Sequence, residues 1–196
     1  MGYLKDHCQF APVTEELLSD LGDFSCADET DISDFFKIKA IPSEREMLSK
    51  SYCLFDAEKK EMVAAFCVLN ATLATEHLPN YSKRAINKEL RYEKQRKQYP
   101  ATLIGQCVVF DKFRELHLGD ELMQFVLSWI MVYAQNMGNR FAVVDAINKP
   151  KVLQFYESNH FHYMFHSDEE ELQAMGKDPN EVLNTRMMYF DLKTIK

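Results

Sequence analysis

The stretch IGQCVVFDKFRELHLGDEL, Ile104–Leu122, joins an apolar run to a short loop with one glycine and to the start of a long helix. The run Leu103–Phe110 is almost continuously apolar and has strand length, which predicts a strand buried on both faces. From Asp120 to Met137 apolar residues recur at steps of three and four, which predicts a helix that ends at Gly138. Its one buried face would consist of Leu122, Val126, Trp129, Ile130, Tyr133 and Met137. A helix that begins directly after a buried strand presents N–H groups and partial positive charge at the sheet edge. This arrangement indicates an anion site suited to phosphate.

The charge of the chain is negative overall and unevenly distributed. The 196 residues, 46% of them hydrophobic, favour one globular domain spanning residues 1–196. A net charge of -7 argues against general binding of polyanions. Eight acids and no base lie between Glu15 and Asp34, whereas seven bases and two acids lie between Lys83 and Lys97. The basic run is either a solvated face or a local docking patch for RNA, including tRNA.

Cysteine usage and hydropathy point to the cytoplasm. The five cysteines are an odd number, are widely spaced and form no CxxC pair, so neither a disulfide framework nor a zinc site is predicted. Acidic residues interrupt the start of the chain before a signal sequence could form. The longest apolar stretch, Phe125–Ala134, is far shorter than the ~20 residues that span a bilayer. We expect a soluble, cytoplasmic protein with reduced cysteines, no metal and no membrane attachment.

The other elements follow from the same periodicities. We predict helices over Thr14–Leu21, Ile32–Ala40 and Lys149–Ser158, and strands over Ser51–Phe55, Met62–Ala71, Phe141–Ile147, Phe161–Phe165 and Arg186–Leu192. The polar stretch Asp56–Glu61 between the first two strands indicates that they form a hairpin. Thr30 or Asp31 would cap the second helix, and Asn148 would cap the third, with Pro150 in its first turn. The stretch Pro79–Tyr99 would be a basic connector, and the acidic run Asp168–Glu171 would lie in a polar connector. The alternation of strands and helices in the second half predicts an α/β domain with a right-handed parallel crossover.

The loop after the first apolar strand resembles the acyl-CoA loop of the GNAT N-acetyltransferases, whose pattern is Gln/Arg-x-x-Gly-x-Gly/Ala. Arg114, His117 and Gly119 occupy its three defining places, with histidine where the pattern has glycine. The stretch VVDAINKPKVLQFYESNHF resembles the next strand and helix of the family, which carry its asparagine and Phe-Tyr pair at Asn148, Phe155 and Tyr156. The stretches FSCADETDISDFFKIKA and YPATLIGQCVV resemble segments of the branch that contains acetyltransferase toxins of toxin-antitoxin pairs.

This resemblance implies an α/β fold and a set of site residues. The fold would be a mixed sheet of six to seven strands flanked by helices and splayed between the two central parallel strands, where the pantetheine arm of acetyl-CoA would enter. The strand Cys107, Val108 and Val109 would face that arm, and an N–H near Val108 or Val109 would polarise the thioester carbonyl. Tyr156 would protonate the departing thiolate. The remaining cofactor-binding residues would be Arg114, His117, Leu118, Gly119 and Asp120 at the pyrophosphate, and Asn148.

The resemblance implies an N-acetyltransferase whose primary amine substrate attacks acetyl-CoA directly. No carboxylate or histidine in the sequence is evident as the general base. A site without a strong base suits an amine that is partly neutral at physiological pH, which favours an α-amine of pKa ~8 over a lysine of pKa ~10.4. Three alternatives stay open: a small-molecule or protein amine, aminoacyl-tRNA as in a toxin, and a degenerate acyl-CoA-binding module without catalysis. The last is motivated by the Cβ of His117 and by the charges of Asp120 and Glu121 beside a bound phosphate. The sequence leaves a homodimer and a partner such as an antitoxin open.

Overall fold

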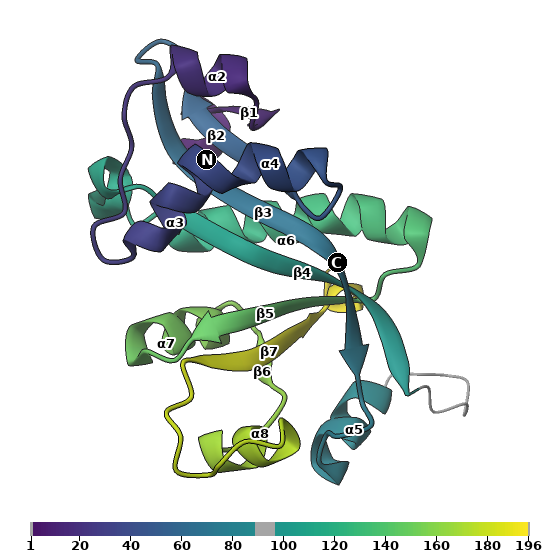
Figure 1. Cartoon of the computed structure of the whole chain (residues 1–196). Helices are drawn as coiled ribbons and strands as arrows, with labels where there is room; N and C mark the ends of the chain where they lie inside the picture. Colours follow the sequence, from purple (N-terminus) through teal and green to yellow (C-terminus); the bar gives the residue numbers. More distant parts are fainter. Residues whose placement is uncertain (1, 89–96, 196) are drawn as a thin grey trace. The chain divides into compact units, whose positions relative to one another are not determined.

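The structure is a computed structural model that describes residues 2–88 and 97–195 (Figure 1). Three bases of the predicted docking patch, Arg91, Lys94 and Arg96, lie outside the described residues. The chain divides into two compact units, Met1–Leu69 with Ile104–Trp129, and Asn70–Leu103 with Ile130–Lys196. A single domain over residues 1–196 stays a prediction.

Seven strands form one sheet in the order β1-β2-β3-β4-β5-β7-β6. They are β1 (Gln9–Pro12), β2 (Lys50–Asp56), β3 (Glu61–Ala74), β4 (Gln98–Val109), β5 (Phe141–Ile147), β6 (His162–Tyr163) and β7 (Thr185–Asp191). β4 and β5 are parallel, whereas β1–β2, β2–β3, β5–β7 and β6–β7 are antiparallel. The predicted mixed sheet and the β2–β3 hairpin are confirmed. The splay between the central strands stays a prediction.

The two predicted helices of the first unit are present, but their bounds differ from the prediction. Besides the short α1 (Tyr3–His7), α2 (Glu15–Asp20) is capped by Thr14, whose Oγ1 accepts a hydrogen bond from the Leu17 N–H at 3.1 Å. The predicted helix Ile32–Ala40 is too short. It is part of a continuous helical stretch of α3 (Thr30–Asp34), a π-helical turn (Phe35–Lys39) and α4 (Ala40–Arg45). The predicted cap at Thr30 or Asp31 is wrong, because both are already helical and Glu29 precedes them without a side-chain cap bond.

The first unit packs these helices on the sheet through an apolar core. Phe36, Cys53, Ala65 and Phe110 are at most 1% exposed within this cluster. In this unit α6 (Gly119–Met137) contributes Phe125 and Trp129 to an aromatic group with Phe10, Tyr52 and Phe66. Ring contacts of this kind add specific geometry to the burial of apolar area, so they fix α6 against β2 and β3 of the same unit.

The predicted bounds of α6 are confirmed, but its predicted buried face is partly wrong. Leu122, Val126 and Ile130 are at most 2% exposed, whereas Tyr133 and Met137 are 49% and 63% exposed. The buried stripe continues from Ile130 to Ala134 at a step of four, which turns Tyr133 and Met137 toward solvent.

The second unit contains β5, α7 (Pro150–Ser158), β6, α8 (Asp168–Ala174) and β7, and also α5 (Asn80–Asn87). The sequence places β6 before β7, yet β7 lies between β5 and β6 in the sheet. Its core includes Phe141, Tyr99, Phe165 and Tyr189. Two predictions are corrected: β6 has two residues rather than the five of Phe161–Phe165, and part of the Pro79–Tyr99 connector is the helix α5.

The acidic run predicted as a connector is the first turn of α8. Ser167 caps this helix by accepting a hydrogen bond from the Glu170 N–H at 3.2 Å. Negative side chains are favourable at a helix N-terminus because the helix dipole is positive there. The run Asp168–Glu171 therefore stabilises a helix that charge patterning alone did not reveal.

Gly138 ends α6 in the left-handed region, at φ +77°. A Cβ added there meets no heavy atom within 4 Å, so substitution costs only backbone strain. We expect Gly138→Ala to lower the free energy of unfolding by about 1 kcal/mol. Denaturant unfolding measures this, with Gly22→Ala as the control, because a Cβ at Gly22 makes an ordinary 3.5 Å contact with the Lys60 carbonyl. Equal stability of the two variants would contradict the assigned helix end.

Candidate functional site

Residues predicted for the site lie in both units, so each group is described within its own unit. The first unit holds the end of β4, the loop and the start of α6. The second unit holds the β5–α7 junction with Asn148, and α7 with Tyr156.

The loop between β4 and α6 is a compact 3₁₀ turn that ends in a left-handed residue. The Phe110 N–H donates to the Val63 carbonyl at 3.0 Å, and the 3₁₀ helix Asp111–Leu116 follows. His117 then has φ +52° and ψ +41° with its side chain exposed. Leu118 is 4% exposed and anchors the start of α6. The histidine thus adopts a conformation that glycine takes without strain, at a cost of roughly 1–2 kcal/mol.

The N–H groups available at this turn are fewer than the sequence predicts. The His117 N–H donates to the Arg114 carbonyl at 3.0 Å and is therefore engaged within the loop. Across the described chain, the structure records no acceptor for the N–H groups of Leu118 and Gly119. These two groups, with the dipole of a 19-residue helix behind them, are the donors that the loop offers to an anion.

Arg114 uses its side chain to fasten the loop rather than to extend into solvent. Its Nε lies 3.1 Å from Asp111 Oδ1, its Nη2 lies 3.0 Å from Cys26 Sγ, and its Nη1 pairs with Asp28. Asp111 Oδ2 also accepts hydrogen bonds from Ser25 Oγ and the Ala27 N–H, both at 2.8 Å. The loop is thereby tied to the segment that precedes α3.

Asp111 is held as a carboxylate by these contacts. Burial acts to raise its pKa, but the hydrogen bonds from Ser25 and Ala27 and the charge of Arg114 outweigh burial and lower the pKa below its ordinary value. Asp111 follows the buried strand directly, and its role was not predicted. The only sequence signal was an acid immediately after an apolar run.

A pocket of about 270 Å³ lies beside the loop and includes Phe110, Lys112 and Phe113 in its wall. Lys59, also in the wall, lies 2.9 Å from Asp56, and Lys112 pairs with Glu61. Because these lysines are paired with carboxylates, the pocket does not present a strong excess of positive charge.

The strand β4 is less buried than predicted. Val108 is 7% exposed and Ile104 is 3% exposed, but Cys107 and Val109 are half-buried and Gly105 is exposed. The prediction of burial on both faces is therefore wrong: alternate residues pack inward, and the face that carries Gly105 is only partly covered. Burial raises the pKa of the Cys107 thiol to about 12, so this side chain stays protonated at neutral pH.

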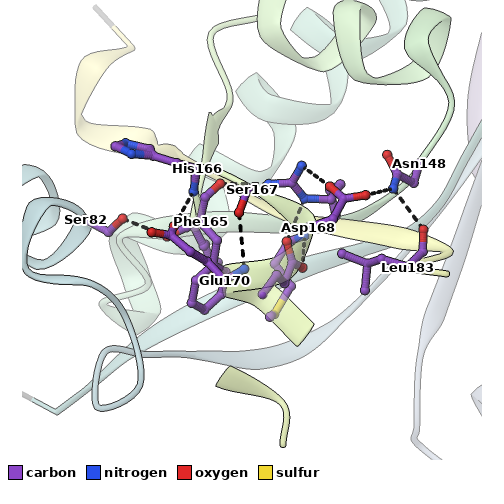
Figure 2. A network of polar contacts seen from close by, with 12 residues as sticks. Ser82, Asn148, Phe165, His166, Ser167, Asp168, Glu170 and Leu183 are labelled. Carbon is purple, nitrogen blue, oxygen red and sulfur yellow. Dashed lines mark hydrogen bonds and ion pairs between the residues drawn. The ribbon is translucent and has the colours of Figure 1, made fainter. Parts of the chain in front are cut away.

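At the β5–α7 junction, the predicted capping role of Asn148 is wrong. Lys149 is the N-cap residue of α7 and makes no side-chain cap bond, whereas Pro150 lies in the first turn as predicted. The Asn148 Nδ2 instead donates to Asp168 Oδ2 at 2.7 Å and to the Leu183 carbonyl at 2.9 Å (Figure 2). Asn148 lies one position before the N-cap residue, so its side chain contacts α8 and does not cap α7.

Tyr156 lies on α7 and is half-buried. Its ring is 5.2 Å from that of Phe155 and 5.3 Å from that of Phe161, and its carbonyl accepts a hydrogen bond from the Phe161 N–H at 3.0 Å. His160 has φ +64° just after the helix, a left-handed conformation that favours glycine. Aromatic packing thus orients the Tyr156 ring within the second unit.

Comparison with known proteins identifies the fold. No protein-family model and no curated protein sequence matches the chain. Solved structures do match, among them AtaT complexed with acetyl-methionyl-tRNAfMet, at 16% identity and a TM-score of 0.70 over 96% of each chain. A tyrosine-to-phenylalanine mutant of KacT matches at 12% identity and a TM-score of 0.73, over 97% of this chain and 98% of that one. AtaTR bound with acetyl-CoA matches at 16% identity and a TM-score of 0.69, over 97% and 96%.

The chain has the GNAT fold of the AtaT and KacT toxins. The fold implied by the resemblance of the loop and of the β5–α7 segment is therefore confirmed. In the described parts of this GNAT fold, no group of three or more His, Cys, Asp and Glu side chains is placed to hold a metal ion. None of the described helices combines the length and the apolar composition needed to cross a membrane.

The acids at the start of α6 differ in what they do in this GNAT fold. Glu121 Oε1 accepts hydrogen bonds from the N–H groups of Leu4 at 2.9 Å and Lys5 at 3.3 Å, at the beginning of α1. Its charge thus serves the N-terminus of a second helix. Asp120 is exposed in the first turn of α6. The carboxylate of Glu121, the other acid predicted to compete with a phosphate, is bound by backbone donors of α1.

Asp111 gives a pH-dependent test of the loop. Because its folded-state pKa lies below the ordinary value, its contribution to stability is present above pH ~4 and is lost as the pH falls through the folded-state pKa. We expect Asp111→Asn to destabilise the protein by about 1 kcal/mol at pH 7 and by progressively less as the pH falls below ~4. Denaturant unfolding at pH 7 and at a series of lower pH values measures this. Glu115→Gln, an exposed change in the same turn, is the control, and an equal loss at every pH would contradict the assignment.

Proposed function

We propose that this protein is an acetyl-CoA-dependent N-acetyltransferase that acetylates a primary amine. The observation that carries the proposal is the turn at His117, which leaves the N–H groups of Leu118 and Gly119 and the N-terminus of α6 at the end of β4. Related support comes from the solved structure of AtaTR bound with acetyl-CoA, which shares this fold.

The residues at the loop fit a pyrophosphate. Two backbone donors and a helix dipole suit a dianionic ligand without a lysine or arginine side chain. The exposed imidazole of His117 would be placed beside the same phosphates, and the exposed face of β4 around Gly105 would accept the pantetheine arm. Asp120 opposes phosphate binding, but the residue is exposed, so its charge is screened by solvent.

The proposed reaction assigns a role to each unit. Bound acetyl-CoA supplies an acetyl thioester as the acyl donor. The N–H of Val108 or Val109 in β4 would donate to the thioester oxygen, where negative charge develops. The nitrogen of the amine substrate attacks the carbonyl carbon, the C–S bond breaks, and Tyr156 donates its hydroxyl proton to the departing sulfur. The nitrogen loses a proton to solvent, which leaves the amide as product, and solvent returns a proton to the Tyr156 hydroxyl. Cys107 takes no part as a nucleophile, because its thiol stays protonated.

Aminoacyl-tRNA is the second candidate for the acceptor. AtaT, which shares this fold, forms a complex with acetyl-methionyl-tRNAfMet, an acetylated α-amine, and α5 of this chain carries the exposed base Arg84. Lys83 is partly engaged, since its Nζ donates to the Glu76 carbonyl at 3.0 Å, and Lys97 pairs with Glu76 at 3.0 Å. The described part of the basic run is thus partly neutralised, so a primary amine of unspecified kind is the broader proposal. The cytoplasmic location expected from the sequence is a further proposal, as are a homodimer and an antitoxin partner, which the sequence leaves open.

Acetyl-CoA binding tests the loop directly. We expect calorimetry to give a micromolar dissociation constant, and Gly119→Glu to weaken it at least about tenfold, because a carboxylate would stand beside the phosphates. Glutamate is favourable in the first turn of a helix, so α6 should stay folded in this variant. Gly119→Ala, which adds no charge, is the matched control and should bind within about threefold of wild type. Absence of binding at millimolar acetyl-CoA would sink the proposal.

A screen of amines tests the chemistry. We expect Tyr156→Phe to lower kcat by about 10²–10⁴-fold without weakening acetyl-CoA binding, because only the proton donor is lost. Tyr133→Phe, a matched change at an exposed tyrosine of α6, should leave kcat unchanged. A Tyr156→Phe variant as fast as wild type would remove Tyr156 from the mechanism.

The same screen separates the two acceptor classes. Acetylation of aminoacyl-tRNA should depend on salt and weaken in Arg84→Gln. Acetylation of a small amine, or of an amino-acid methyl ester, should be insensitive to both changes. If tRNA binding is unchanged by Arg84→Gln at low and high salt, α5 is not the contact surface.

A further inference from the structure

Arg186 on β7 makes three polar contacts with almost no exposure to solvent. Its Nε lies 2.8 Å from Glu171 Oε2, its Nη1 lies 2.6 Å from Asp168 Oδ1, and its Nη2 donates to the Phe165 carbonyl at 2.8 Å (Figure 2). The residue is 7% exposed, and its guanidinium also lies over the Tyr163 ring at 4.9 Å. One side chain thus joins β7, β6 and α8 within the second unit.

The same contacts continue to the start of α7. Asp168 Oδ2, the oxygen that Arg186 Nη1 does not contact, accepts the hydrogen bond from Asn148 Nδ2 at 2.7 Å. The Asn148 backbone N–H donates to the Asn184 carbonyl at 2.8 Å. Asn148 directly follows β5 and stands two residues before Pro150, the first residue of α7. The direction in which the chain leaves β5 is therefore fixed by Asn148, whose side chain is held by Asp168 and by the Leu183 carbonyl, 2.9 Å from its Nδ2.

α7 packs within its own unit through half-buried side chains, among them Val152, Leu153 and Phe155. None of its residues is fully buried, and its N-cap residue makes no side-chain cap bond. A helix with few buried apolar contacts is held more loosely than a core helix, so polar contacts at its ends contribute more to fixing its position. Tyr156 lies on this helix, and its ring packs against Phe155 and Phe161.

Burying the charged groups of this network costs free energy that a purely structural role does not require. Glu171 is fully buried, and burial raises its pKa although Arg186 and the Met187 N–H, 2.7 Å from Oε1, act to lower it. Buried ion pairs often contribute no more stability than apolar side chains of similar volume. What such a network provides is a single hydrogen-bonding geometry, since each member has a defined partner and direction.

We propose that Asp168 and Arg186 are positioning residues that hold α7, and with it Tyr156, in register through Asn148. The inference rests on the proposed acetyl transfer, in which Tyr156 gives its proton to the departing thiol. Displacement of a reacting group by about 1 Å lowers a rate by roughly 10²-fold, so loosening of α7 should be visible in kcat. Binding of acetyl-CoA through the loop of the first unit should be unaffected.

Asp168→Asn tests the link, because the asparagine amide turns one donor toward either Arg186 or Asn148, which are themselves donors. We expect kcat to fall by about 10- to 100-fold with KM for acetyl-CoA within about twofold of wild type. In a Tyr156→Phe background, Asp168→Asn should cost less than about twofold more, since the group it positions is already lost. An equal loss of kcat in both backgrounds would show a merely structural effect and overturn the proposal.

Asp191→Asn is the matched control. Asp191 makes a bidentate ion pair with Arg140 in the same unit, with distances of 3.1, 3.2 and 2.6 Å. Neither residue contacts Asn148 or α7 through any hydrogen bond recorded in the described chain. We expect Asp191→Asn to lower stability to a similar degree and to leave kcat unchanged. If both variants lower kcat equally, the loss reflects stability alone and the proposal fails.

A second measurement needs no catalysis and so distinguishes failure of this inference from failure of the proposed function. Hydrogen exchange of the α7 amides should be at least about tenfold faster in Asp168→Asn than in wild type or Asp191→Asn. Asn148→Ala should give the same result while leaving Arg186 paired with both carboxylates, and it replaces Asp168→Asn if that variant does not fold. Unchanged protection of α7 would overturn the inference, whether or not the wild type transfers acetyl.

Discussion

β4 is hydrogen-bonded along both of its edges, to β3 on one side and to β5 on the other, and it runs through both compact units of the chain. A strand in this position must satisfy its backbone groups through the sheet. Pro100 lacks a donor, but it lies near the start of the strand with its side chain exposed, and its carbonyl accepts from the Arg140 N–H at 3.3 Å. Where the strand ends, the Phe110 N–H is taken by Val63, and the chain turns at once into the loop and α6.

In the first unit, the acidic groups near the loop interact mainly with other groups of the same unit. The acids nearest the loop are bound to partners: Asp111 to Ser25, Ala27 and Arg114, and Glu121 to the N-terminus of α1. An acidic chain can therefore present a loop whose available groups are backbone donors. This local arrangement, rather than the net charge of -7, decides whether a phosphate can bind.

In the second unit, a network of polar contacts joins helices to strands, as apolar packing does elsewhere in the chain. Arg186, Glu171 and Asp168 join α8 to β7 and reach Asn148 at the start of α7 (Figure 2). The buried members are satisfied by defined partners, so the network favours one arrangement of its surroundings over others of similar compactness. A general acid requires a defined position, because proton transfer depends on its distance from the departing atom.

The sequence by itself determined the elements whose periodicity is long and regular, and the order in which they occur. β5 and the β2–β3 hairpin follow from apolar runs of strand length, and α6 follows from three- and four-residue steps and from the glycine at position 138. The ordered motifs around Gly119 and Tyr156 also indicated the GNAT fold. The Ser-x-x-Glu pattern at Ser167 was a further local signal, typical of a capping box, and it would have predicted α8. Only the tertiary structure decided the partners of the site residues. The place of β7 between β5 and β6, and the contact of Asn148 with Asp168 twenty positions away, depend on contacts that local patterns do not encode. The left-handed conformation of His117 arises because the chain must pass from a 3₁₀ turn into α6 while Leu118 is buried. Periodicity reports which side of an element is apolar, whereas the packing of distant segments selects the atom that each polar group meets.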